Sequence, residues 1–66
     1  MSNKEMHEFT LELHHETHSA ILVSEGEDSE EFWLPKSQIE YRVAPDNKEL
    51  VFVEIPEWLA IEKGLF

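Results

Sequence analysis

The sequence contains no cysteine and only two glycines, and both shortages limit its chemistry. Without cysteine, the chain has no disulfide bonds and no thiolate ligands for a metal ion. Two glycines are too few for a loop that cradles phosphate groups, and no serine stands in the glycine-flanked pattern of a hydrolase nucleophile. The absence of cysteine fits a reducing compartment, and we expect a cytoplasmic protein.

Long apolar runs are also absent from the sequence. No run approaches the length of about 20 residues that spans a bilayer, so we expect no membrane partner. The segment Met1–Glu8 has neither the basic region nor the apolar stretch of a signal peptide.

Basic residues are scarce relative to acidic ones. Five lysines and arginines face fifteen aspartates and glutamates, which gives a net charge of −10. Such a surface repels nucleic acid and attracts proteins with basic grooves. We therefore expect a basic nucleic-acid-binding protein as the partner, and no direct contact with nucleic acid. Five acids are concentrated within seven residues: Glu25, Glu27, Asp28, Glu30 and Glu31.

The length and composition predict one small folded domain over residues 1–66. An apolar fraction of 41% is too high for a disordered acidic tail. A chain this short buries only about 60% of its unfolded surface, so we expect a thin core and modest stability. Residues 1–6 are polar, and we expect them to fray.

Hydrophobic alternation predicts the first strand. Phe9, Leu11 and Leu13 share one side, and polar residues occupy the other, which is the period of a half-buried strand. A helix over part of residues 5–18 is the alternative, but the alternation favours the strand. Residues 14–17 then read as a turn.

Four further strands and one helix complete the predicted fold. We expect strands over 20–23, covered on both faces, then 31–34, 38–43 and 49–55, with a turn over 44–48 and a positive φ at Gly26. Pro56 suits the first turn of a short helix, which ends at Gly64. The fold class is therefore α+β and mostly β: a small antiparallel sheet or open barrel of about five strands with one short C-terminal helix.

Three histidines, His14, His15 and His18, form a candidate metal site. Imidazoles bind zinc, copper or nickel, but the spacing is not the His-Glu-x-x-His of zinc proteases. On a strand His14 and His15 point to opposite faces. We therefore interpret the segment as a polar turn and assign no metal and no cofactor.

The sequence offers little support for catalysis or a calcium loop. Paired catalytic carboxylates need a cleft, which a domain this thin hardly provides. In the acidic segment Gly26 stands second rather than sixth, so the EF-hand pattern fails. We expect no enzymatic activity.

The remaining acids include three that are predicted to lie on strand faces. Glu8 and Glu12 share the polar face of the first strand, and Glu40 lies on that of the fourth. Residues i and i+2 of a strand are about 6.6 Å apart. Two phosphate steps along one DNA strand advance about 6.8 Å. An acidic sheet face can therefore approximate a row of phosphates.

The segments Trp33–Glu40 and Val53–Leu65 resemble small proteins of phages and mobile elements that share a WLPKSQ…PEWLA…KGL pattern. The resemblance covers roughly residues 19–65. Its residues look structural: Trp33, Leu34, Ile39, Trp58 and Leu59 as core, Pro35 and Pro56 as boundaries, and Gly64 as a cap. As a very acidic and short member of this group, the chain is similar to anti-CRISPR proteins, and the resemblance points to a type I-C system as the target. The resemblance implies action in the cytoplasm of a bacterial host on a CRISPR effector subunit.

These observations lead to two functional hypotheses. The first is an anti-CRISPR inhibitor that mimics DNA and blocks target recognition by a type I surveillance complex (Cascade), with contacts from Glu25, Glu27, Asp28, Glu30, Glu31, Glu8 and Glu12. The alternative is a non-enzymatic module of a mobile element that binds through its sheet edge or through Trp58, Leu65 and Phe66, while the acids only confer solubility. A homodimer is compatible with either, because so thin a domain leaves apolar surface uncovered.

Overall fold

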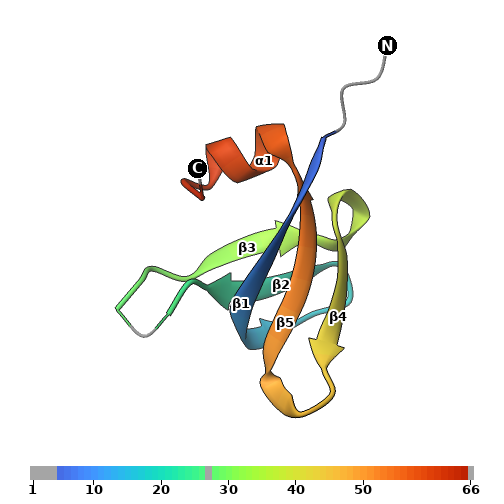
Figure 1. Ribbon diagram of the computed structural model, residues 1–66, viewed down its shortest axis with the longest axis vertical. Coiled ribbons are helices and arrows are strands. Elements are labelled where there is room, and N and C mark those ends of the chain that lie inside the picture. Colours follow the sequence, from blue (N-terminus) through green and yellow to red (C-terminus); the bar gives the residue numbers. More distant parts are fainter. Residues whose placement is uncertain (1–4, 27, 66) are drawn as a thin grey trace.

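The computed structural model describes residues 5–26 and 28–65, which form one open antiparallel sheet and a short helix at one end of it (Figure 1). The strand order in the sheet is β3-β2-β1-β5-β4. This confirms the predicted fold class. The elements are β1 (Met6–Glu16), β2 (Ala20–Ser24), β3 (Phe32–Pro35), a 3₁₀ turn η1 (Lys36–Gln38), β4 (Glu40–Ala44), β5 (Asn47–Pro56) and α1 (Glu57–Glu62).

The central strand β1 belongs to both halves of the sheet. Its first part pairs with β5, with Leu11 opposite Val51, and its last part pairs with β2, with Leu13 opposite Val23. The register shifts between Leu13 and His15, and such an irregularity bends a strand and increases its twist. As a result β2 and β3 run steeply across the direction of β5 in Figure 1, and the sheet wraps around its own core.

The core fills the concave side of this sheet, and α1 covers one end of it. Alternate residues of β5 supply its centre, and Leu59 and Ala60 add the buried face of α1. The buried cluster comprises Leu11, Ile21, Val23, Leu34, Ile39, Val51, Val53, Ile55, Leu59 and Ala60.

The side chain of Glu16 joins distant parts of the curved sheet. Lys36 Nζ and Tyr41 Oη each donate a hydrogen bond to Glu16 Oε2 at 2.8 Å. The Lys36 hydrogen bond is the main cause of a lowered pKa at Glu16, and the Tyr41 hydrogen bond lowers it further. The same pairing with Glu16 raises the pKa of Lys36. This contact connects the end of β1 to η1 and to β4.

The first strand is longer than predicted, and the turn after it comes later. His14, His15 and Glu16 belong to β1, and the reversal takes place at Thr17–Ser19, where Thr17 Oγ1 accepts from the backbone N–H of Ala20. The prediction of a turn over 14–17 was therefore wrong, because the bulge lets the strand continue past Leu13. The helical alternative over 5–18 is excluded. Met6 pairs with Pro56, so it does not fray as expected, while residues 1–4 lie outside the described residues.

Both tryptophans were wrongly assigned to the core. Trp33 is 44% exposed and Trp58 is 52% exposed, whereas their neighbours Leu34 and Leu59 are buried. A strand alternates its faces, so Trp33 points away from the side that Leu34 buries, and the buried side of the six-residue helix falls on Leu59 and Ala60, which leaves Trp58 outside it. Strand β2 is likewise covered less fully than predicted, because Leu22 is only half-buried.

The turns follow the predicted chemistry at two places and depart from it at one. The β4–β5 turn consists of Pro45 and Asp46, and Asn47 Oδ1 accepts the backbone N–H of Glu49 at 2.9 Å. Gly64, with φ of 80°, follows α1 as predicted. The loop bends at Gly26 without the positive φ that the sequence predicted there.

None of the helices in the described part of the chain is long and apolar enough to cross a membrane.

Candidate functional site: an acidic face of the sheet

Three glutamates form a row across the convex face of the sheet. Glu54 of β5 lies directly opposite Glu8 of β1 on one side and Glu40 of β4 on the other. All three are exposed, while the residues flanking Glu54, Val53 and Ile55, point into the core. Because neighbouring strands are about 4.8 Å apart, the row holds one carboxylate at each such interval. Like charges directly opposite each other destabilise a sheet, so the fold tolerates this row rather than gaining from it.

A shallow hollow of about 290 Å³ lies beside the glutamate row. It is lined by Glu8, Glu40, Tyr41, Arg42, Phe52 and Glu54. The guanidinium of Arg42 stacks over the ring of Phe52, 4.9 Å from its centroid. This stacking partly covers the apolar ring and places one positive group at the edge of an acidic surface.

The histidine at the bulge, His14, connects the strand face to the loop between β2 and β3. Its Nε2 lies 4.0 Å from Glu12 Oε1, and its Nδ1 lies 3.6 Å from Glu31 Oε2. Its Nε2 is also 2.7 Å from the hydroxyl of Ser24, which is 1% exposed. The acids of β1 and the last acid of the loop therefore lie on one continuous surface.

The β2–β3 loop presents its described acids to solvent. Ser24 Oγ donates to the carbonyl of Gly26 at 3.2 Å, and the N–H of Ser29 donates to the same carbonyl at 3.1 Å, so the loop is closed around Gly26. The four exposed acids of the loop that the structure describes are Glu25, Asp28, Glu30 and Glu31. Glu27, also predicted as a contact residue, lies outside the described residues.

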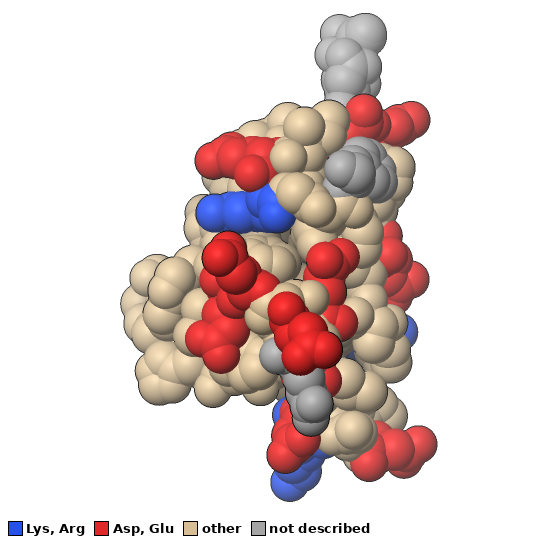
Figure 2. All heavy atoms as spheres, turned by 90° about the vertical axis from the view of Figure 1, so that its left-hand side faces the viewer, with Lys and Arg blue, Asp and Glu red and all other residues tan. Residues whose placement is uncertain are grey.

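Few cations compensate this acidic face. Over residues 5–26 and 28–65, the structure shows one ion pair between a carboxylate and a lysine or arginine, that of Glu16 with Lys36. In Figure 2 acidic side chains are spread over the whole height of the face that carries this loop, with several near its middle, and only a few basic groups show among them. The field of this face is therefore strongly negative.

Sequence reasoning found most of these acids but missed how they are arranged. It placed Glu8, Glu12 and Glu40 on polar strand faces, and the structure agrees with that placement. It did not single out Glu54, although the alternation of Glu54 with Val53 and Ile55 was a usable signal. It could not foresee that His14 brings Glu31 to Glu12.

The histidine cluster does not assemble as a metal site. His14 turns toward Glu12 and Ser24, whereas the ring of His15 packs edge-on against Trp33 at 6.2 Å between centroids. In the part of the chain that the structure describes, the one group of three potential ligands within 4.8 Å is Glu5, His7 and Glu57.

The arrangement offers groups that can bind cationic side chains. The convex face offers exposed carboxylates around a shallow hollow, and such groups can accept hydrogen bonds from arginine and lysine side chains. Comparisons with protein-family models, with curated proteins and with solved structures found no match.

Proposed function

We propose that this protein is a non-enzymatic inhibitor that occupies a basic, DNA-binding surface of another protein. The target class that the sequence resemblance suggests is a type I CRISPR surveillance complex, and type I-C is the favoured subtype. On this proposal the acidic face competes with target DNA for the same groove. Electrostatic attraction would speed the encounter and make the affinity depend on salt.

The observation that carries this proposal is the continuity of the acidic face. The glutamate row of Glu8, Glu54 and Glu40 gives one carboxylate per about 4.8 Å across the strands. A DNA strand carries one phosphate per about 3.4 Å of helix axis, so the glutamate row repeats its negative charge at a somewhat wider interval than DNA does. The face extends from the strands to the loop, because His14 lies within 4.0 Å of Glu12 on β1 and 3.6 Å from Glu31 of the loop. A solubilising coat mixes both signs of charge evenly, whereas the hollow on this face is lined by three carboxylates and a single cation, Arg42.

The decisive experiment is a competition assay with matched charge reversals. The first variant combines Glu25→Lys, Asp28→Lys and Glu30→Lys in the loop. The control combines Asp46→Lys, Glu49→Lys and Glu62→Lys, which change the net charge by the same amount at other places. Purified type I-C complex is mixed with labelled target DNA, and DNA binding is measured with each protein added.

We expect the native protein and the control to block DNA binding, and the loop variant to lose at least tenfold in potency. Circular dichroism verifies that both variants are folded. If the loop variant inhibits as well as the native protein, DNA mimicry by this face is wrong. If both variants lose potency equally, only the net charge matters and the proposed contact surface is wrong.

A second candidate function is supported by apolar exposure at the helical end of the domain. Met6 is 41% exposed, Trp58 52% and Ile61 56%. Met6 and Trp58 line a common groove of about 330 Å³, which a partner of a mobile-element assembly could fill. Leu65 packs against the core, so it contributes less to such a contact than the sequence suggested, and Phe66 lies outside the described residues.

The two functions predict opposite responses to substitution. For the assembly module, Trp58→Ala combined with Ile61→Ala removes partner binding in a pull-down from the bacterial host, and the loop reversals are tolerated. For the inhibitor, the loop reversals remove binding and the apolar substitutions leave it within about threefold of native.

A further inference from the structure

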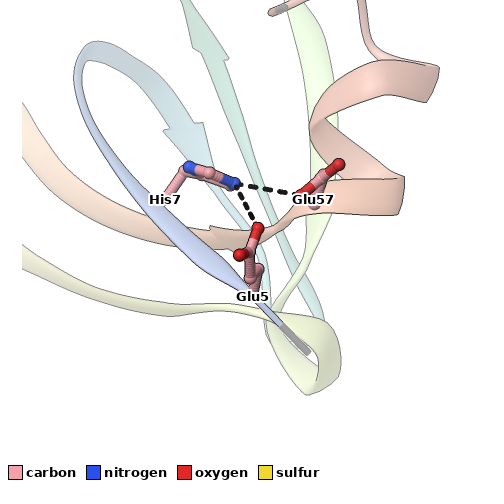
Figure 3. Close-up of side chains that lie close together, drawn as sticks. All are labelled: Glu5, His7 and Glu57. Carbon is pink, nitrogen blue, oxygen red and sulfur yellow. Dashed lines mark hydrogen bonds and ion pairs between the residues drawn. The ribbon is translucent and has the colours of Figure 1, made fainter. Parts of the chain in front are cut away.

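Three side chains with metal-binding atoms converge where the start of β1 meets the start of α1. Figure 3 shows Glu5 and His7 from the N-terminal segment and Glu57 from the helix directed toward one another. His7 Nε2 lies 3.4 Å from Glu57 Oε1 and 3.8 Å from Glu5 Oε1. One ligand atom from each of the three residues lies within 4.8 Å of the other two.

The backbone fixes this convergence between segments that are fifty residues apart in sequence. The N–H of Glu57 donates to the carbonyl of Glu5 at 2.9 Å, and His7 pairs with Ile55 in the β1–β5 ladder. The three side chains are therefore attached to a hydrogen-bonded frame. Such a frame reduces the conformational entropy that binding a ligand would cost.

The distances match the edges of a zinc coordination tetrahedron. Zinc binds imidazole nitrogen and carboxylate oxygen at about 2.0 to 2.2 Å, so ligand atoms around a tetrahedral ion are about 3.4 Å apart. The separation of His7 Nε2 from Glu57 Oε1 equals this edge, and that from Glu5 Oε1 exceeds it by less than half an ångström. A small side-chain rotation of Glu5 closes the difference.

The chemistry of the group favours a transition metal over magnesium or calcium. The histidine nitrogen suits zinc, nickel or copper, whereas magnesium and calcium prefer oxygen ligands.

We propose that Glu5, His7 and Glu57 form a zinc site that joins the first strand to the C-terminal helix, with water as the fourth ligand. The site is distinct from the acidic face and does not depend on the proposed inhibition. When bound, the ion replaces the hydrogen bond of His7 with Glu57 and the longer ion-pair contact of His7 with Glu5 by three coordination bonds, so it stabilises the junction of β1 and α1.

The test is calorimetric titration of the full, tag-free chain with zinc chloride, in a buffer that does not chelate metals. His7→Ala removes the nitrogen ligand, and Glu57→Gln removes a carboxylate. His18→Ala is the matched control, since it deletes a histidine in the β1–β2 turn. Magnesium chloride is titrated in parallel, and circular dichroism verifies the fold of each variant.

We expect one zinc ion per native chain and a rise in the unfolding temperature with zinc. His7→Ala and Glu57→Gln should each weaken zinc binding at least tenfold, and His18→Ala should leave it within twofold. Amide NMR shifts on adding zinc should be confined to residues near positions 5–8 and 55–58.

Three results would overturn the proposal. These are no saturable binding by the native chain, equal zinc affinity in the native and His7→Ala proteins, or NMR shifts centred on the β2–β3 loop. The last two correspond to an adventitious ion only. If His7→Ala does not fold, Glu57→Gln and the NMR map decide the question alone.

Discussion

Glu8 of β1 lies directly opposite Glu54 of β5, so two exposed carboxylates occupy a position where a sheet gains most from complementary side chains. Glu40 extends the pairing on the other side of Glu54. Each such like-charge pair destabilises a sheet by a fraction of a kcal/mol, up to about 1. A small domain has little stability to lose, which makes this row a candidate for a functional feature.

Removal of the central charge in this row should stabilise the protein. Glu54→Gln keeps the size of the side chain and relieves repulsion with both neighbours, so we expect a gain of about 0.5 to 1 kcal/mol in the free energy of unfolding. Urea denaturation at low salt measures it, and the gain should shrink in 1 M sodium chloride as the charges are screened.

Glu30→Gln serves as the control for Glu54→Gln because Glu30 is exposed in the loop and is not paired across strands. We expect Glu30→Gln to change stability by less than half as much. A loss of stability in Glu54→Gln would show that the row is not repulsive.

The contact of Glu16 with Lys36 and Tyr41 predicts a specific pH dependence. The folded protein lowers the pKa of Glu16 below its ordinary value of 4.5, chiefly through the Lys36 hydrogen bond. The stabilising contribution is therefore present above that ordinary pKa and is lost as the pH falls through the lowered pKa of the folded state. Glu16→Gln should reduce stability at pH 7 and make a smaller difference at pH 2.5.

The measurement for Glu16 is the difference in urea midpoint between native and variant proteins at both pH values. This difference isolates Glu16 from the many other acids that titrate in the same range. A difference that is unchanged between pH 7 and pH 2.5 would show that the charge of Glu16 does not contribute. The raised pKa of Lys36 extends the same stabilisation upward, until the pH passes that raised value.

Adjacent residues of α1 should respond very differently to truncation. Leu59 is 3% exposed within the core, and Trp58 is 52% exposed. Leu59→Ala removes buried contacts and leaves a cavity, which costs about 2 to 5 kcal/mol and should unfold a large fraction of so small a domain. Trp58→Ala should cost less than about 1 kcal/mol. Thermal unfolding followed by circular dichroism compares the two, and similar losses would contradict the position of α1.

The sequence predicted the fold well where one rule decided the structure. Alternation in β1 and β5 gave the strands, and proline and asparagine gave the turn that joins β4 to β5. It predicted poorly where neighbouring residues compete for one buried side. Trp33 and Leu34 are both apolar, and only the three-dimensional sheet decides that Leu34 points inward. The bulge after Leu13 has no signature in residue type, so the end of β1 was misplaced.

The candidate site was predictable as a composition but not as a surface. Acidic residues at alternate strand positions can be found by inspection. The register that aligns Glu8, Glu54 and Glu40 depends on pairing between three strands, and the register shift between Val43 and Ala44 adds an irregularity that the sequence does not reveal. The convergence of Glu5 and His7 with Glu57 likewise depends on a contact between the two ends of the described chain.

The link between the loop and the strand face rests on His14, which supplies the last prediction. His14 Nε2 is 2.7 Å from the hydroxyl of buried Ser24, and Ser24 in turn donates to the carbonyl of Gly26 at the start of the loop. His14→Ala removes the first of these hydrogen bonds and the imidazole between Glu12 and Glu31, and we expect it to cost about 1 kcal/mol. Compared with the native protein, the variant should show faster amide hydrogen exchange over residues 28–31, because the loop loses its attachment to β1. Exchange in the β4–β5 turn should stay the same. His15→Ala is the control, since His15 packs against Trp33 on a different part of the surface. If His14→Ala leaves exchange in the loop unchanged, the loop is held by its own turn around Gly26, and the continuity of the acidic face does not depend on this histidine.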